Sequence, residues 1–240
     1  MPSTSLATAA VVTALLAALA ACQSMAPRAG AITTDVPAAP DRAGRHVIYV
    51  HDNALDRTPD DAERRARWMR VTQAIAASGA NVIAEVRPAG TIQKPPEDLD
   101  RYARRVARQV QQLLAAGVPA SRVTVVGYSR GAVMTLMSST HVADPRVGYV
   151  AIAGCMNETG AFKAFVPVMM RYAEKFSGEF LAVNEQSDPD FASCTPYFAR
   201  STSRHSLAER TLATGKGHNF AVETDAAWVE PVTSWIMARS

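Results

Sequence analysis

The chain carries little net charge for its size. Its 240 residues include 25 Lys and Arg and 22 Asp and Glu, which leave a formal charge of +3, too small to indicate a nucleic-acid partner. No segment repeats with the period of a solenoid or a propeller, and no His, Cys and Asp have the spacing of a zinc site. The sequence therefore predicts one ordinary globular domain without a nucleic-acid partner, a metal or a cofactor.

The chain also has no apolar run long enough for a clear transmembrane helix, which needs roughly 20 residues. The run from Leu6 to Ala21 is Ala-rich and uncharged, as in the apolar part of a secretory signal. It ends in Leu19-Ala20-Ala21-Cys22, which resembles the lipobox of bacterial lipoproteins, where cleavage precedes the Cys and the Cys carries the lipid. No Lys or Arg precedes Leu6, which departs from that pattern. A buried Ala-rich helix and an ordinary cleaved signal are the alternatives.

The lipobox resemblance implies where the mature protein begins and where it resides. Residues 1–21 are expected to be a signal peptide and Cys22 the lipidation site, and Gln23 resembles the residue that sorts such proteins to the outer membrane. Residues 22–44 are rich in Ala, Pro and Gly, which predicts a flexible tether. The expected partner is then the membrane, through the lipid, on the periplasmic side of the outer membrane. Without lipidation we expect a periplasmic or secreted protein.

Cysteine is scarce, and only Cys155 and Cys194 accompany Cys22. Export would place these two thiols in an oxidising compartment, where disulfides persist. Each follows a predicted strand, which favours positions on the same face of the sheet. We therefore expect a disulfide between them, with two buried free thiols as the alternative.

Short β-branched runs alternate with helical patterns after residue 44. Continuous apolar runs are typical of strands buried on both faces, and their alternation with helices predicts a parallel sheet with right-handed crossovers. We expect one α/β domain over residues 45–240, with a mostly parallel sheet of about six strands and helices on both faces. The expected strands are His46–Val50, Asn81–Val86, Arg122–Val126, Val147–Ala153, Glu179–Asn184 and Leu207–Ala213.

The segment Gly127-Tyr128-Ser129-Arg130-Gly131 carries the first candidate for chemistry. It begins where a β-branched strand stops and it opens an apolar helix over Ala132–Ser139. So tight a strand-to-helix turn forces an unfavourable backbone at the serine, and glycine on either side removes the steric clash. The Ser129 hydroxyl is then exposed beyond the carboxyl ends of the strands, where such sheets bind ligands.

A serine hydroxyl needs a base to become a good nucleophile. His218 lies in the glycine-flanked loop after the last predicted strand, at the edge of the sheet where Ser129 is expected. His51, at the end of the first predicted strand, is the rival, whereas the other three histidines are more easily structural. The base in turn needs a carboxylate. Asp188 in the loop after the fifth strand is our choice, and Glu185 and Asp190 in the same loop are its alternatives.

The order Ser129, Asp188, His218 and the sequences GYSRG, EQSDP and GKGHNF resemble the α/β-hydrolase family over roughly residues 45–238. The resemblance implies a serine hydrolase in which the amides of Asn53 and Arg130 form an oxyanion hole. Asp52 departs from the family pattern, which has Gly at that position. Two strands of the larger family members are expected to be absent.

The same resemblance implies cleavage of a small-molecule carboxylic ester through an acyl-enzyme, without cofactor. Amidase, peptidase or thioesterase activity with the same triad is an alternative, and Asp52 favours a further one, an inactive binding protein. Residues 156–178 contain several large apolar side chains. They are expected to form the ordinary crossover helix, with an apolar lid over an acyl pocket as the alternative.

Overall fold

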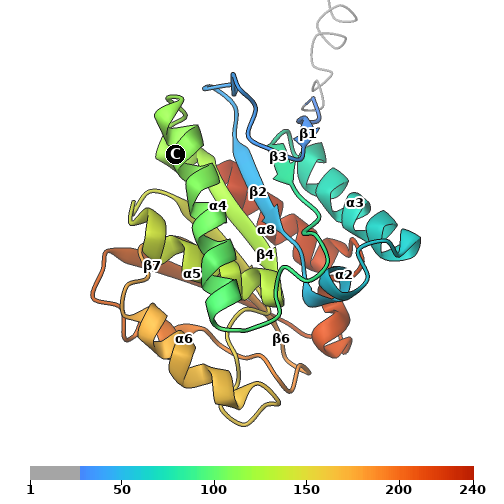
Figure 1. Ribbon diagram of the computed structural model, residues 1–240, viewed down its shortest axis with the longest axis vertical. Coiled ribbons are helices and arrows are strands. Elements are labelled where there is room, and N and C mark those ends of the chain that lie inside the picture. Colours follow the sequence, from blue (N-terminus) through green and yellow to red (C-terminus); the bar gives the residue numbers. More distant parts are fainter. Residues whose placement is uncertain (1–27) are drawn as a thin grey trace, which may run out of the picture.

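A computed structural model describes residues 28–240 (Figure 1). Within that range seven strands form one sheet with the order β1-β3-β2-β4-β5-β6-β7, and every neighbouring pair is parallel. The mostly parallel sheet predicted from the sequence is confirmed, with one strand more than expected. The strands are β1 (Ile32–Thr33), β2 (His46–Val50), β3 (Asn81–Ala84), β4 (Val123–Tyr128), β5 (Gly148–Ile152), β6 (Gly178–Glu185) and β7 (His205–Leu212).

The central strands are built from β-branched and aromatic residues that are buried throughout. Every residue of β2, β4 and β5 is buried, as expected where helices cover both faces of a parallel sheet. β7 differs, because half-buried and exposed residues alternate along most of its length. That alternation and its charged residues suit an edge strand, since charge at an edge opposes pairing with another chain.

Helices cover both faces of the sheet (Figure 1). α4, α5 and α6 pack in succession over one face, and α3 and α8 pack together over the other. α4 buries Leu99, Tyr102, Val106, Val110 and Leu113 along one stripe, which is the helical periodicity expected from the sequence. The helices are α2 (Asn53–Arg57), α3 (Ala62–Ala77), α4 (Glu97–Ala115), α5 (Arg130–Val142), α6 (Val166–Ala173), α7 (Thr195–Phe198) and α8 (Ala226–Ala238).

The tether expected at residues 22–44 is wrong for the segment that contains β1. Ile32 and Thr33 pair with Val82 and Ile83 of β3, and the Gly30 amide donates a 2.8 Å hydrogen bond to the Ala76 carbonyl. Two β-branched residues suffice to extend the sheet, although the surrounding Ala, Pro and Gly are typical of a linker. The expected signal peptide (residues 1–21), the lipidation site Cys22 and the start of the tether lie outside the described residues. Within residues 28–240, none of the helices has the length and apolar character needed to cross a membrane.

Candidate active site

Ser129 occupies the turn between β4 and α5 with a strained backbone. Its φ of 55° and ψ of −122° lie in a region that side-chain-bearing residues rarely adopt. The turn is held by the Ser129 amide, which donates to the Ile152 carbonyl of β5 at 2.8 Å. A Cβ on Gly127 would lie 2.4 Å from the Gly131 carbonyl oxygen, and one on Gly131 would lie 2.0 Å from the Val50 oxygen. Larger residues at these two positions would therefore push α5 away from β2 and β4.

The structure brings the three residues of the expected triad together. The Ser129 hydroxyl lies 2.8 Å from His218 Nε2, and His218 Nδ1 lies 2.8 Å from Asp188 Oδ2. A neutral imidazole satisfies both contacts when it donates its Nδ1 proton to Asp188 and accepts the serine proton at Nε2. The Asp188 side chain is fully buried, whereas that of His218 is 31% exposed. The hydroxyl can therefore lose its proton to a base that solvent and ligands can approach.

Two aromatic rings stack on the His218 imidazole. The Phe191 ring stacks on it at a centroid distance of 4.7 Å, and the Tyr128 ring stacks on it at 5.5 Å. The Tyr128 hydroxyl also donates a hydrogen bond to the His218 backbone carbonyl. These contacts restrict the rotation of the imidazole. Tyr128 is part of the serine motif, but nothing in the sequence signalled the position of Phe191.

The rival base, His51, has hydrogen-bond partners other than Ser129. It is buried, its Nε2 accepts a 3.0 Å hydrogen bond from the Arg87 amide, and its Nδ1 donates to the Asp52 carbonyl at 2.9 Å. Burial, and then the neighbouring Arg87 cation, hold the pKa of His51 well below its usual value. His51 is therefore a neutral structural residue under the loop that follows β2.

The two rival carboxylates have other partners. Glu185 accepts hydrogen bonds from the amide and hydroxyl of Thr214 at 3.0 and 2.9 Å, so it joins the loop of Asp188 to the loop of His218. Asp190 accepts from the Ala161 amide at 2.7 Å. Only Asp188, of the three carboxylates in this loop, contacts His218.

The loop after β2 turns the Asp52 carboxylate into the first turn of α2, where it accepts a hydrogen bond from the Leu55 amide at 3.2 Å. This is an ordinary N-cap contact for an aspartate. Asn53 and Arg130, the two expected oxyanion donors, are the first residues of α2 and α5. The N–H groups at these positions have no partner within their own helices and lie at the positive ends of the helix dipoles.

Arg87 is a buried residue beneath this loop that sequence reasoning missed. Its side chain has no exposed surface, and it donates to the His51 and Asp52 carbonyls at 2.7 and 2.9 Å. It also pairs with Asp56 at 2.6 Å and lies over the Tyr102 ring. The available signal was an arginine three residues after the end of β3, at the same edge of the sheet as Ser129.

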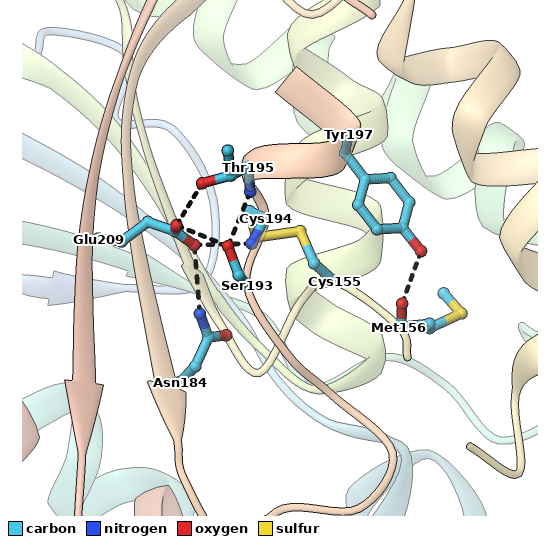
Figure 2. Close-up of a disulfide and its surroundings, with 8 residues drawn as sticks. All are labelled: Cys155, Met156, Asn184, Ser193, Cys194, Thr195, Tyr197 and Glu209. Carbon is cyan, nitrogen blue, oxygen red and sulfur yellow. Dashed lines mark hydrogen bonds between the residues drawn. A yellow bond between two sulfur atoms is a disulfide. The ribbon is translucent and has the colours of Figure 1, made fainter. Parts of the chain in front are cut away.

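A disulfide joins Cys155 and Cys194 (Figure 2). Figure 2 shows its surroundings, where Glu209 of β7 accepts from the Cys194 amide at 2.6 Å and the Tyr197 hydroxyl donates to the Met156 carbonyl at 2.9 Å. Cys155 follows β5, and Cys194 ends the loop that carries Asp188 and Phe191. The disulfide therefore connects that loop to the centre of the sheet.

Replacing both Cys155 and Cys194 by Ala is expected to lower the free energy of unfolding by about 3–4 kcal/mol, since the bond closes a loop of 39 residues. Urea unfolding followed by circular dichroism would measure the loss. Reduction of the wild type should reproduce the loss and should leave the double variant unchanged. An equal effect of the reductant on both proteins would contradict the prediction.

A hollow of about 660 Å³ opens beside Ser129 and His218. α2 and α3 form one wall, and residues 219–223 after His218 form another. From the 156–178 segment only Phe162 lines the hollow. α6 in that segment buries Val166, Met169 and Ala173 against the core, so the segment is chiefly the crossover from β5 to β6.

Ser129 after β4, Asp188 after β6 and His218 after β7 stand at the carboxyl edge of a parallel sheet, and this arrangement is an α/β-hydrolase fold. The phospholipase/carboxylesterase family matches residues 83–172, which include Ser129. A comparison of the sequence with curated proteins finds no match.

Solved structures with a similar fold include several esterases. An esterase from Rhizomucor miehei is 11% identical with a TM-score of 0.59, over 84% of this chain and 76% of that one. The Pyrococcus furiosus esterase Pf2001 is 15% identical with a TM-score of 0.57, over 83% and 85%. A monoacylglycerol lipase from Paleococcus ferrophilus is 11% identical with a TM-score of 0.55, over 81% and 95%. At these identities the likeness establishes the fold.

Proposed function

We propose that this protein is a serine hydrolase that cleaves carboxylic esters with Ser129, His218 and Asp188. The observation that carries the proposal is the pair of 2.8 Å contacts that link the three side chains beside an open hollow. The strained backbone of Ser129 supports it, because strain of this kind persists where the surrounding structure enforces it and is frequent at active sites. The names of the structural neighbours, esterases and a lipase, favour an ester over an amide.

In the first half of the reaction, the Ser129 oxygen attacks the carbonyl carbon of the ester while His218 Nε2 takes the hydroxyl proton. The buried Asp188 carboxylate stabilises the imidazolium that forms. The amides of Asn53 and Arg130 bind the developing oxyanion. When the tetrahedral intermediate collapses, the C–O bond to the alcohol breaks, His218 returns its proton to the leaving oxygen, and the acyl group remains on Ser129.

In the second half, His218 takes a proton from a water molecule as the water oxygen attacks the acyl carbon. The bond to Ser129 then breaks, His218 protonates the serine oxygen, and a carboxylic acid is released. The 31% exposure of His218 supports this step, because water can approach the imidazole. The capping contact of the Asp52 carboxylate removes the main reason to expect an inactive binding protein, since that negative charge is already bound to the α2 N-terminus.

A fluorophosphonate probe tests the proposal directly, because it reacts with activated serines. We expect one adduct per chain, located on Ser129 by mass spectrometry of proteolytic fragments, and its loss after heat denaturation. A panel of esters, thioesters and anilides with the same acyl group would then rank the leaving groups, with the ester turned over fastest. Labelling at another serine, or none in the folded protein, would overturn the assignment.

A further inference from the structure

The hollow beside Ser129 is lined by charged side chains of both signs. Six of its lining residues are Asp, Glu or Arg, namely Asp52, Arg57, Arg64, Arg67, Asp190 and Glu223. A charge in a partly enclosed site is stabilised by a partner, and one without a partner is available to a ligand. The partners of these six residues therefore indicate which charge the hollow offers to a substrate.

The three carboxylates are all engaged. Asp52 caps α2, and Asp190 accepts from the Ala161 amide at 2.7 Å. Glu223 forms ion pairs with Arg67 and Arg70 at 3.2 and 3.1 Å. Each negative charge in the hollow therefore already has a protein donor.

Two of the three arginines are engaged as well. Arg64 donates to the Ala54 carbonyl and the Thr58 hydroxyl at 2.7 and 2.8 Å, and Arg67 pairs with Glu223 at 3.2 Å. Arg57 differs. It is exposed, and within residues 28–240 its side chain forms neither a hydrogen bond nor an ion pair. Among the residues that the structure describes, Arg57 is therefore the one of these six charged side chains without a hydrogen-bond or ion-pair partner.

Arg57 is also close to the chemistry. It ends the short helix that Asn53 begins, so its backbone lies only about 6 Å along the helix from the proposed oxyanion donor. Burial is the main cause that lowers the pKa of the Arg130 side chain, and the Arg87 and Arg57 cations lower it further, against the opposing effect of Asp56. Arg57 is therefore near enough to Arg130, which follows the nucleophile, for its charge to act on that side chain.

We infer that the physiological substrate is an ester that also bears a carboxylate, and that Arg57 binds this carboxylate while Ser129 attacks the ester carbonyl. The inference rests on the proposed function and adds the substrate class. A guanidinium can bind a carboxylate through two parallel hydrogen bonds. An arginine on a distant surface would simply be solvated, whereas Arg57 lines the same hollow as the nucleophile.

Matched esters test the inference. 4-Nitrophenyl hemiglutarate carries the carboxylate on the acyl side, and 4-acetoxybenzoate carries it on the alcohol side. Their neutral controls are 4-nitrophenyl valerate and methyl 4-acetoxybenzoate. The substitution Arg57→Gln is expected to raise KM about five- to twenty-fold for the better of the two anionic esters. The KM values of both neutral esters should stay unchanged. Arg57→Lys should recover part of the affinity. Added salt should weaken binding of the anionic esters to the wild type and to Arg57→Lys, and should have no such effect on Arg57→Gln.

Arg108→Gln is the control variant. Arg108 is exposed on α4 and does not line the hollow, so this substitution removes the same charge at a site away from Ser129. It should change no KM. If Arg57→Gln affects charged and neutral esters equally, or neither, the inference is wrong while the proposed function stands. If the wild type hydrolyses none of the four esters and takes no fluorophosphonate, the proposed function itself fails.

Discussion

Ser129→Ala is expected to lower kcat for ester hydrolysis by at least about 10⁴-fold and to leave the folded structure intact. The hydroxyl is the only group the substitution removes, and its 2.8 Å contact with His218 is the one it breaks. The backbone of the turn keeps its support, because the Ser129 amide still donates to the Ile152 carbonyl. Steady-state kinetics with 4-nitrophenyl acetate and a thermal unfolding curve would measure both effects.

Ser206→Ala provides the matched control for this measurement. Ser206 is exposed near the start of β7, and so lies toward the opposite edge of the parallel sheet from Ser129. The kcat of the Ser206→Ala variant should equal that of the wild type. Residual activity of Ser129→Ala above about one hundredth of the wild-type kcat would show that another group attacks the ester.

Much of the fold could be predicted because the central strands are buried on both faces. Runs such as Val47–Val50 and Val123–Val126 are continuous stretches of buried, mostly β-branched residues, and this pattern is hard to mistake when helical periodicity separates the runs. β1 could not be predicted in this way. It consists of two residues whose pairing with β3 depends on a partner about fifty positions away, and no local pattern signals such a contact.

The site was predictable to the extent that chain order and strand ends determine it. Ser129 and His218 each follow a strand at the same edge, so their meeting could be expected. The choice of Asp188 over Glu185 and Asp190 could not be derived with the same force, because three carboxylates within six residues differ only in the partners that the folded loop gives them. Arg87, after β3, contacts the carbonyls of His51 and Asp52, after β2. These residues are far apart in the chain, and a single sequence carries almost no trace of such a contact.

Arg87 has a consequence for catalysis through the peptide unit that joins Asp52 to Asn53. In a trans peptide the C=O and N–H groups point in opposite directions. Because the Asp52 carbonyl is bound to Arg87 at 2.9 Å and to His51 at 2.9 Å, the Asn53 amide is directed away from the buried guanidinium, toward the side of the loop that lines the hollow. We propose that Arg87 is a positioning residue for this oxyanion donor.

Arg87→Met is therefore expected to lower kcat about 10²- to 10³-fold with little change in KM for a neutral ester, the cost of misplacing one oxyanion donor. It is also expected to lower the free energy of unfolding by about 3–5 kcal/mol, because Asp56 loses its closest buried partner. Kinetics and urea unfolding on the same protein would measure the two losses.

The variant Arg87→Met/Asp56→Asn separates the two effects. Removing both charges of a buried pair costs far less stability than removing one, so the double variant should regain most of the unfolding free energy. Its kcat should stay low, because the Asp52 carbonyl still lacks the guanidinium that fixes the Asn53 amide. A stable double variant with wild-type kcat would show that Arg87 only supports the fold and that the geometry of the Asn53 amide is set without it.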